Sequence, residues 1–143
     1  MARLVEDVLA LQSLACLAAG VVVGFERGPT VIWVRLDAPK IKQVIANLCK
    51  NAVEAMADGG HLTVKVCRSG RSAMVEMTDS GIGVPADVDV FELFTTTKHS
   101  GRGLGLALAR EIVTAHHGAI EFTSAPGRGT TFQMSLPMSE PQS

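Results

Sequence analysis

The chain has 143 residues, of which 47% are hydrophobic and 19% are charged, and its formal net charge is −1 at pH 7. This composition indicates one globular domain with a substantial core, and the balanced charge argues against nucleic acid or a charged membrane surface as a partner. The three cysteines are odd in number and form no C-x-x-C pair, so Cys16, Cys49 and Cys67 are expected to be reduced, buried thiols of a cytoplasmic protein.

The N-terminal segment predicts an amphipathic helix over residues 3–19 that ends at Gly20. Glu6 and Asp7 precede its apolar tract, which is unlike a signal peptide. No apolar run in the chain approaches the roughly 18 residues that a membrane-spanning helix needs. We therefore expect no membrane contact by this fragment, and a membrane anchor elsewhere in the parent protein stays open.

Two short apolar segments, 21–26 and 31–36, are then expected to be strands around a turn at residues 28–29. Asp37 is placed to cap a second helix, which is predicted over 38–57 and is followed by an Asp-Gly-Gly sequence. This part of the chain therefore predicts a pair of strands followed by a capped helix.

The remaining chain is predicted as a hairpin, a glycine-rich region, a helix and a second hairpin: 61–68 with 73–79, 80–102, 103–116, and 119–124 with 130–137. Helices that fall between strand pairs favour one sheet covered on one side. The predicted fold class is α/β, a two-layer sandwich of a mixed, mostly antiparallel sheet with about three helices on one face. We expect one domain over residues 1–137 and a disordered tail over 138–143.

The helix predicted over 38–57 has an apolar and a polar side at about 100° per residue. The apolar side comprises Ile41, Val44, Ile45, Leu48, Ala52, Ala55 and Met56, and the polar side comprises Gln43, Asn47, Lys50, Asn51, Glu54 and Asp58. Asparagine is a middling-to-poor helix former, and amide oxygens suit a hard cation such as Mg²⁺ that also takes phosphate oxygens. Asn47 and Asn51 are therefore candidates for a metal and phosphate site. The alternative is an ordinary amphipathic helix with a solvated polar face.

The sequence "TDSGIGVP" (78–85) places Asp79 at the end of a predicted strand, with glycines two and four residues later. A carboxylate there can accept a hydrogen bond from the exocyclic amine of adenine. It rejects guanine, because the 6-oxo group would set acceptor against acceptor. The glycines would let a flat ring approach the backbone. A plain turn is the alternative.

The sequence "GRGLGLALAREIV" (101–113) has glycine at every second position of 101–105 and then continues into a helix. The spacing is not the G-x-G-x-x-G dinucleotide fingerprint, and no G-K-[ST] of a P-loop is present. A flexible glycine loop at a helix N-terminus presents free N–H groups and a dipole that attract phosphate. Lys98 and Arg102 add positive charge, so this segment is predicted to bind phosphates.

Five segments in this order resemble the motifs of sensor histidine kinases: "NLCKNAVEAM" (47–56), "DSGIG" (79–83), "FELFTTTK" (91–98), "GRGLGLALAREIV" (101–113) and "GRGTTFQMSLP" (127–137). The resemblance covers about residues 1–137, the whole ATP-binding catalytic domain of that family. It implies the Bergerat-type ATP-binding fold that the family shares with DNA gyrase, mismatch-repair and heat-shock ATPases.

The resemblance also implies roles for single residues. Asn51 would hold Mg²⁺, Asn47 would support the phosphates or their waters, and Asp79 would bind adenine. Residues 95–105 would form a mobile ATP lid, and Thr130 would lie near the adenine end. Asn47 and Asn51 are the candidate catalytic residues. The candidate nucleotide-binding residues are Asn47, Lys50, Asn51, Asp79, Gly81, Ile82, Gly83, Phe94, Thr96, Lys98, Gly101, Arg102, Gly103, Leu104, Gly105, Leu106 and Thr130.

These kinases carry a phosphoacceptor histidine in a motif on a separate helical hairpin, and this chain shows no such motif. Its four histidines are His61, His99, His116 and His117, and none lies in such a motif. The adjacent pair 116–117 ends a predicted helix, where an imidazolium interacts favourably with the helix dipole, so a structural role is expected for it.

The implied activity is transfer of the γ-phosphoryl group of ATP to a histidine on a separate dimerisation domain, in the same or another chain, and through it to a response regulator. The domain itself is expected to be a cytoplasmic monomer that does not bind nucleic acid. Two alternatives share the fold: a stand-alone serine kinase of the anti-sigma type, and a module that binds ATP only to regulate a partner. The first has Glu where this chain has Asn47, which counts against it.

Overall fold

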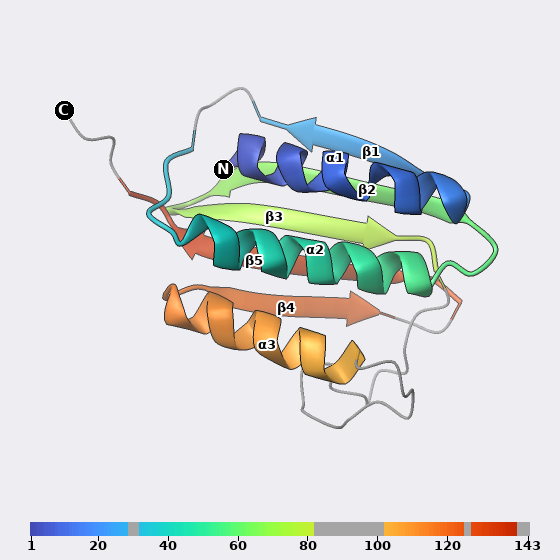
Figure 1. Ribbon diagram of the computed structural model, residues 1–143. Coiled ribbons are helices and arrows are strands. Elements are labelled where there is room, and N and C mark those ends of the chain that lie inside the picture. The colour runs from blue at the N-terminus through green and yellow to red at the C-terminus, as the bar shows by residue number, and fades with distance from the viewer. Residues whose placement is uncertain (29–31, 82–101, 125–126, 140–143) are drawn as a thin grey trace.

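A computed structural model describes residues 1–28, 32–81, 102–124 and 127–139 of the chain. Its elements are α1 (Ala2–Ala18), β1 (Val21–Arg27), α2 (Ala38–Glu54), β2 (Gly60–Ser69), β3 (Ser72–Asp79), α3 (Arg102–Ala115), β4 (Ala119–Ser124) and β5 (Thr130–Pro137) (Figure 1). For residues 102–104 only the helical backbone is described.

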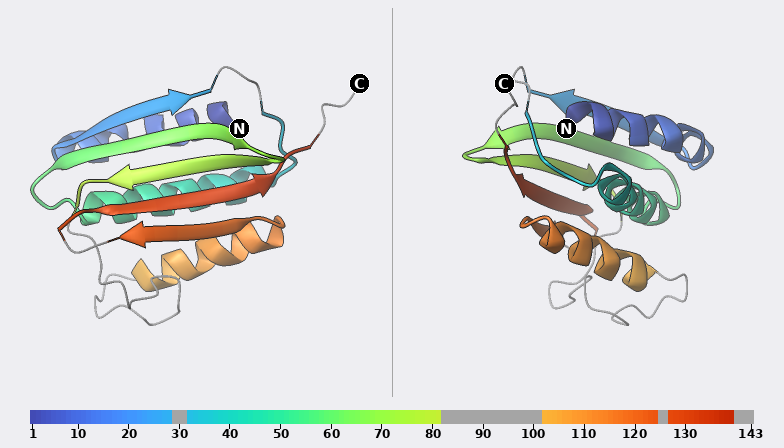
Figure 2. Two further views of the ribbon diagram at one scale, coloured as in Figure 1. Left: turned by 180° about the vertical axis from the view of Figure 1, so that it is seen from behind. Right: turned by 60° about the vertical axis from the view of Figure 1, so that its left-hand side comes forward.

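The five strands form one sheet in the order β1-β2-β3-β5-β4. β1 and β2 are parallel, and the other three pairs are antiparallel. All three helices lie on the same face of this sheet, with α2 between α1 and α3 (Figures 1 and 2). The predicted two-layer α/β sandwich with a mixed, mostly antiparallel sheet is confirmed.

The core lies between the sheet and α2, because both present apolar side chains at the spacing that their geometry requires. Every residue predicted for the apolar side of α2 and its C-terminal end is buried: Ile41, Val44, Ile45, Leu48, Ala52, Ala55 and Met56. The strands alternate, and β3 and β5 bury every second side chain along their length. Because the apolar side of α2 packs on the sheet, the orientation of its polar side relative to the sheet is fixed.

Local sequence signals explain where the helices begin and end. The Asp37 carboxylate accepts a hydrogen bond from Lys40 N (3.2 Å), which confirms the predicted cap of α2. Gly20, with φ +73°, follows the last turn of α1 as predicted. The predicted ends of α2 and α3 are corrected, since α2 ends at Glu54 and α3 runs from Arg102 to Ala115.

The strand predicted over 31–36 is wrong for the part that the structure describes, residues 32–36. These residues join no sheet, and the carbonyl groups of two of them bind elsewhere. Trp33 O accepts from Ser139 N (2.8 Å), and Ile32 O accepts from the amino group of Met1 (3.4 Å). β1 pairs instead with β2, in parallel, so the expected pair of neighbouring strands is replaced by a crossover through α2.

The two predicted hairpins, β2–β3 and β4–β5, are confirmed. Gly70 lies at the β2–β3 turn in the left-handed region (φ +59°). Met138 N donates to Arg71 O (2.9 Å), so hydrogen bonding continues beyond the predicted domain end at residue 137. Residues 140–143 of the predicted tail lie outside the described residues.

The cysteines are free thiols, and Cys16 and Cys49 are buried as predicted. Cys67 is half-buried, which corrects its prediction, because it points to the face of β2 opposite Leu62, Val64 and Val66. No helix in the described part of the chain is long and apolar enough to cross a membrane.

Candidate functional site

Asp79 is the last residue of β3 and one of the few buried polar side chains, with 3% of its surface exposed. Its backbone lies opposite Leu62 of β2 on one side and Thr130 of β5 on the other. Its Oδ1 accepts a hydrogen bond from Gly81 N at 2.8 Å. The carboxylate is therefore held in one orientation at the end of a central strand.

Glycine is required at two positions around Asp79, one beside its carboxylate and one beside its main-chain carbonyl group. A Cβ at Gly81 would lie 2.6 Å from Ala55 O and 2.9 Å from Asp79 Oδ1. A Cβ at Gly129 would overlap the Asp79 carbonyl oxygen, and Gly129 also has φ +76°. Sequence analysis singled out Gly81 but not Gly129, for which the only signal is a glycine directly before a strand in the 127–137 motif.

Thr130 is buried and pairs with Asp79 across β3 and β5. Its Oγ1 is 2.8 Å from Ser124 Oγ, and Ser124 Oγ also donates to Gly129 O at 2.9 Å. These bonds tie the end of β4 to the start of β5 and thereby fix Thr130. Ser124 was not predicted, because nothing in its local sequence shows that it faces residues five and six positions later.

Asn47 joins α2 to the first turn of α3. Its Nδ2 donates to Gly105 O at 3.3 Å, which leaves the amide oxygen for other ligands. A Cβ at Gly105 would lie at an ordinary contact distance of 3.8 Å from the Asn47 amide, so the protein interior does not require glycine there. Asn51 is half-buried one turn later on the same side of α2, and Lys50 is exposed.

The two parts of the site lie at different points along α2. Gly81 packs against Ala55 at the C-terminal end of the helix, and Ser80 Oγ contacts Met56 Sδ at 3.6 Å. Asn47 lies eight residues earlier, which corresponds to roughly 12 Å along the helix axis. The polar side of α2 thus connects the Asp79 end to the α3 end.

Several predicted site residues lie outside the described residues: Ile82, Gly83, Phe94, Thr96, Lys98 and Gly101. Arg102, Gly103 and Leu104 belong to the first turn of α3, so the glycine sequence enters the helix and does not end before it. Leu106 is 5% exposed and packs in the core.

His116 makes the structural contacts expected of it, although not as an imidazolium. Its Nε2 accepts a hydrogen bond from Asp37 N at 3.0 Å, and its Nδ1 is 2.8 Å from Ile112 O. A ring nitrogen that accepts carries no proton, so Nδ1–H donates to Ile112 O and the ring is neutral. His116 therefore links the end of α3 to the cap of α2. His117 has φ +62°, the left-handed conformation that ends the helix.

The described residues contain no group of three or more His, Cys, Asp or Glu side chains that could hold a metal ion. A cation at this site would depend on amide oxygens and on oxygens of a ligand, which are the hard donors that Mg²⁺ accepts. The donor set of α2 fits such an ion.

A family model described as "Histidine kinase-, DNA gyrase B-, and HSP90-like ATPase" matches residues 36–140. The chain belongs to this ATPase family. It is 36% identical to sporulation kinase A of Bacillus subtilis over 137 residues, 94% of this chain and 23% of that protein. It is 40% identical over 111 residues to the C4-dicarboxylate transport sensor protein DctS of Rhodobacter capsulatus, 73% of this chain and 17% of that protein. The ATPase domain described here spans less than a quarter of either relative.

Solved structures agree with this membership. The catalytic domain of histidine kinase ThkA superposes with a TM-score of 0.85 at 29% identity, over 94% of this chain and 90% of that one. Full-length ShkA in complex with AMPPNP gives a TM-score of 0.88 at 23% identity, over 99% of this chain and 31% of that one, which shows the fold alone. The resemblance to the ATP-binding catalytic domain of sensor histidine kinases is confirmed.

Proposed function

We propose that this ATPase-family domain binds Mg·ATP and transfers the γ-phosphoryl group to a histidine on a separate dimerisation domain. The observation that carries the proposal is the buried Asp79 carboxylate, oriented by the amide of Gly81 at a position where only glycine fits. Such an acceptor, fixed before ligand arrives, loses little entropy on binding.

Adenine is the ligand that best matches this acceptor. Its exocyclic amine donates, whereas the corresponding oxygen of guanine would face the carboxylate with a second acceptor. Gly81 packs its backbone against Ala55 beside the carboxylate, and Thr130 lies on the neighbouring strand. We therefore expect the domain to prefer ATP to GTP.

The phosphates would lie toward the other end of the polar side of α2. Asn51 would ligate Mg²⁺ through its amide oxygen, and Asn47 would support the phosphates or their waters. The bound ion would bridge and neutralise phosphate oxygens. The N-terminus of α3, which Asn47 contacts, supplies backbone N–H groups and a favourable dipole for phosphate.

The reaction is transfer rather than rapid hydrolysis. A neutral amide cannot accept a proton, so Asn47 cannot act as a general base for water. None of the four histidines of the chain lies in a phosphoacceptor motif, and His116 uses both ring nitrogens within the fold. The acceptor histidine would therefore come from another domain, in the same or another chain. Two-component signalling would follow, with a response regulator as the final acceptor and the cytoplasm as the compartment.

The proposal is tested by incubating the 143-residue chain with Mg²⁺ and ATP labelled on the γ-phosphate, with and without a separately purified histidine-bearing dimerisation domain. We expect ATP binding, very slow release of phosphate, and label on the added domain that is stable in base and lost in acid. Binding without transfer would support a regulatory ATP-binding module instead. Rapid hydrolysis of ATP that is abolished by Glu54→Gln would show that the proposed transfer reaction is wrong.

A further inference from the structure

The residues His61 and Ser80 form the last hydrogen-bonded pair of β2 and β3. In an antiparallel sheet the two residues of such a pair exchange two main-chain hydrogen bonds. Ser80 N donates to His61 O at 3.1 Å, but the return bond runs from His61 N to the hydroxyl oxygen of Ser80, at 2.9 Å. The hydroxyl takes the place of a main-chain carbonyl group, so the chain can leave the strand at Ser80 while both main-chain groups of His61 stay bonded.

The chain turns at Ser80. In a regular strand its side chain would lie on the same face of the sheet as that of Thr78, away from the helices. Its hydroxyl instead donates to Sδ of the buried Met56, two residues after the end of α2, at 3.6 Å. The turn also brings Gly81 N to 2.8 Å from Asp79 Oδ1. The bond that orients the Asp79 carboxylate therefore depends on how the strand ends.

The hydroxyl of Ser80 fills the space beside Gly60, the first residue of β2. A Cβ at Gly60 would lie 2.5 Å from Ser80 Oγ and 2.8 Å from Met56 Sδ. A hydroxyl has one hydrogen to donate and lone pairs that accept, and this one donates to Met56 and accepts from His61 N. Its position is therefore fixed by two segments, the residues after α2 and the start of β2.

The start of β2 is held in turn by the residues that follow α1. Gly60 N donates to Gly20 O at 3.2 Å, and a Cβ at Gly59 would lie 2.7 Å from the same oxygen. Gly20 and Gly59 have positive φ, +73° and +86°, and at Gly59 a side chain would also clash, so the two main chains meet directly. His61 N comes directly after this contact and is a donor with a fixed position.

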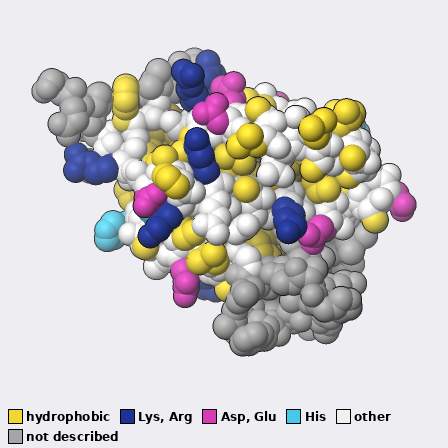
Figure 3. Space-filling view, in the orientation of Figure 1, with side chains coloured by type: hydrophobic (Ala, Val, Ile, Leu, Met, Phe, Trp, Pro, Cys, Tyr) yellow, Lys and Arg dark blue, Asp and Glu magenta, His cyan; other side chains and the backbone are white. Residues whose placement is uncertain are grey.

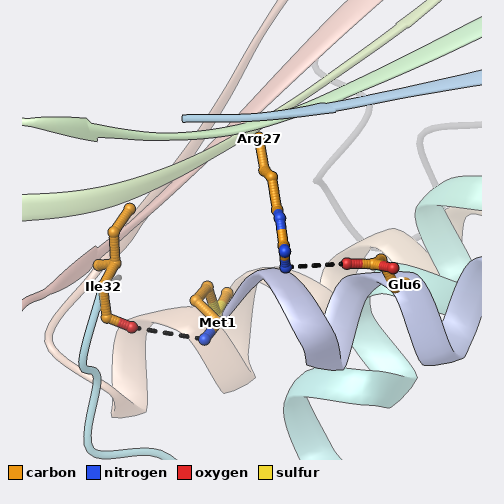
Figure 4. A network of polar contacts seen from close by, with 4 residues as sticks. All are labelled: Met1, Glu6, Arg27 and Ile32. Atoms are coloured by element: carbon orange, nitrogen blue, oxygen red, sulfur yellow. Dashed lines mark hydrogen bonds and ion pairs between the residues drawn. The ribbon is translucent and has the colours of Figure 1, made fainter. Parts of the chain in front are cut away.

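The other end of α1 is attached to the fold as well. The amino group of Met1 donates to Ile32 O at 3.4 Å, and Glu6 forms an ion pair with Arg27 of β1 at 3.2 Å (Figure 4). The helix whose C-terminal end supports the start of β2 is therefore attached at both of its ends.

We propose that Ser80 is a positioning residue for adenine recognition. Its hydroxyl accepts from His61 N at the end of the ladder and thereby holds the turn whose Gly81 amide orients the Asp79 carboxylate. This role rests on the proposed nucleotide site, because Ser80 acts on the ligand through Asp79. Without the hydroxyl the carboxylate is no longer held in one orientation, and ordering it on binding costs entropy.

The test substitutes Ser80 in the 143-residue chain and measures nucleotide affinity by isothermal titration calorimetry. Ser80→Ala should weaken ATP binding roughly three- to tenfold, because His61 N loses its acceptor and the turn no longer holds Asp79. The preference for ATP over GTP should fall as well. Ser80→Thr should keep both the affinity and the preference, since it retains the hydroxyl and residue 80 is exposed enough to accept a methyl group.

A double substitution shows whether Ser80 acts through Asp79. In a chain with Asp79→Asn, the further change Ser80→Ala should weaken ATP binding less than about twofold, because the carboxylate that Ser80 positions is gone. Amide hydrogen exchange without nucleotide measures the turn directly. Ser80→Ala should speed exchange of the His61 and Gly81 amides and leave that of Val64, within β2, unchanged.

Ser13→Ala is the matched control. It also removes a hydroxyl that is bonded to the main chain, since Ser13 Oγ donates to Ala10 O at 2.8 Å. It lies on the exposed part of α1, where Leu11, Leu14 and Leu17 contribute to the hydrophobic surface seen in Figure 3. This variant should bind ATP as the unsubstituted chain does.

Equal ATP affinity in the unsubstituted chain and in Ser80→Ala would overturn the proposal. So would a Ser80→Thr variant as weak as Ser80→Ala, or losses from Asp79→Asn and Ser80→Ala that add in full. An unsubstituted chain that binds no ATP would contradict the proposed function and, with it, the role of Ser80. The failure of the proposed function and the failure of the role of Ser80 alone are therefore distinguished by the unsubstituted chain.

Discussion

Asp79 has its backbone and its carboxylate fixed by different neighbours. The ladder with Leu62 and Thr130 fixes the strand, Gly129 packs on the carbonyl group, and the Gly81 amide holds Oδ1. The result is an acceptor whose direction is set before any ligand binds.

Asp79→Asn should weaken ATP binding at least about tenfold, or about 1.4 kcal/mol. The Gly81 amide keeps an acceptor at one position, so the new NH₂ group takes the place of the other oxygen and donates toward the adenine amine. Isothermal titration calorimetry measures the dissociation constant. Glu76→Gln on the same strand is the control, because its side chain bonds Gln133 and lies outside the site. Unchanged affinity in a folded Asp79→Asn variant would remove Asp79 from the pocket.

Asn47→Asp should lower the free energy of unfolding by about 1–2 kcal/mol, because the new carboxylate cannot donate to Gly105 O and sets acceptor against acceptor. Denaturant titration without nucleotide measures the effect. Gln43→Glu makes the same chemical change one turn earlier on the exposed side of α2 and should cost little. Equal losses in both variants would mean that the contact between α2 and α3 contributes nothing specific.

At the scale of elements, local patterns predicted the hairpins well and failed for residues 32–36. The β2–β3 hairpin needs only two alternating segments and a residue such as Gly70 that accepts positive φ. A strand also needs a partner, and apolar composition cannot show that the carbonyl of Trp33 binds Ser139 instead. The parallel pairing of β1 with β2 spans the whole of α2, so no short window contains it.

The loop before β5 contains a matched pair of glycines, both with φ +76°. Gly127→Ala faces open space and should cost only the backbone strain, about 1 kcal/mol. Gly129→Ala adds a clash with the Asp79 carbonyl group and should cost more than about 2 kcal/mol. Thermal and denaturant unfolding compare the two variants. Similar losses would show that the loop moves away from Asp79 without cost.

Across the whole molecule, single candidate residues were easier to predict than the contacts between residues far apart in the chain. The Asp79 and Asn47 positions followed from charge, helix propensity and motif order, which a single sequence contains. The contacts of Asn47 with Gly105 and of Asp37 with His116 join residues far apart in the chain, and the exclusion of a side chain at Gly129 depends on how β3 and β5 pack. Such contacts depend on the assembled fold and therefore required a structure.

The stability of the whole domain should fall as the pH rises above about 9, because the pKa of Cys49 is raised by burial from 9.0 to about 12. In this window the unfolded chain releases the Cys49 proton and the folded chain keeps it. The folded state then binds more protons, and its stability decreases by up to about 1.4 kcal/mol per pH unit. The raised pKa of Cys16 acts in the same direction.

Denaturant unfolding at about pH 8, 9 and 10 measures this slope. The chain contains no tyrosine, so thiols and amines are the groups that titrate there, and comparing variants cancels the amines. Cys49→Ala lowers stability at every pH by leaving a cavity, and it should also make the slope shallower, since the Cys49 proton no longer distinguishes the folded from the unfolded state. Cys67→Ala, on the other face of β2, should keep the slope of the unmodified chain. A slope in Cys49→Ala as steep as that of the unmodified chain would mean that the buried thiol of α2 does not cause the loss of stability in alkali.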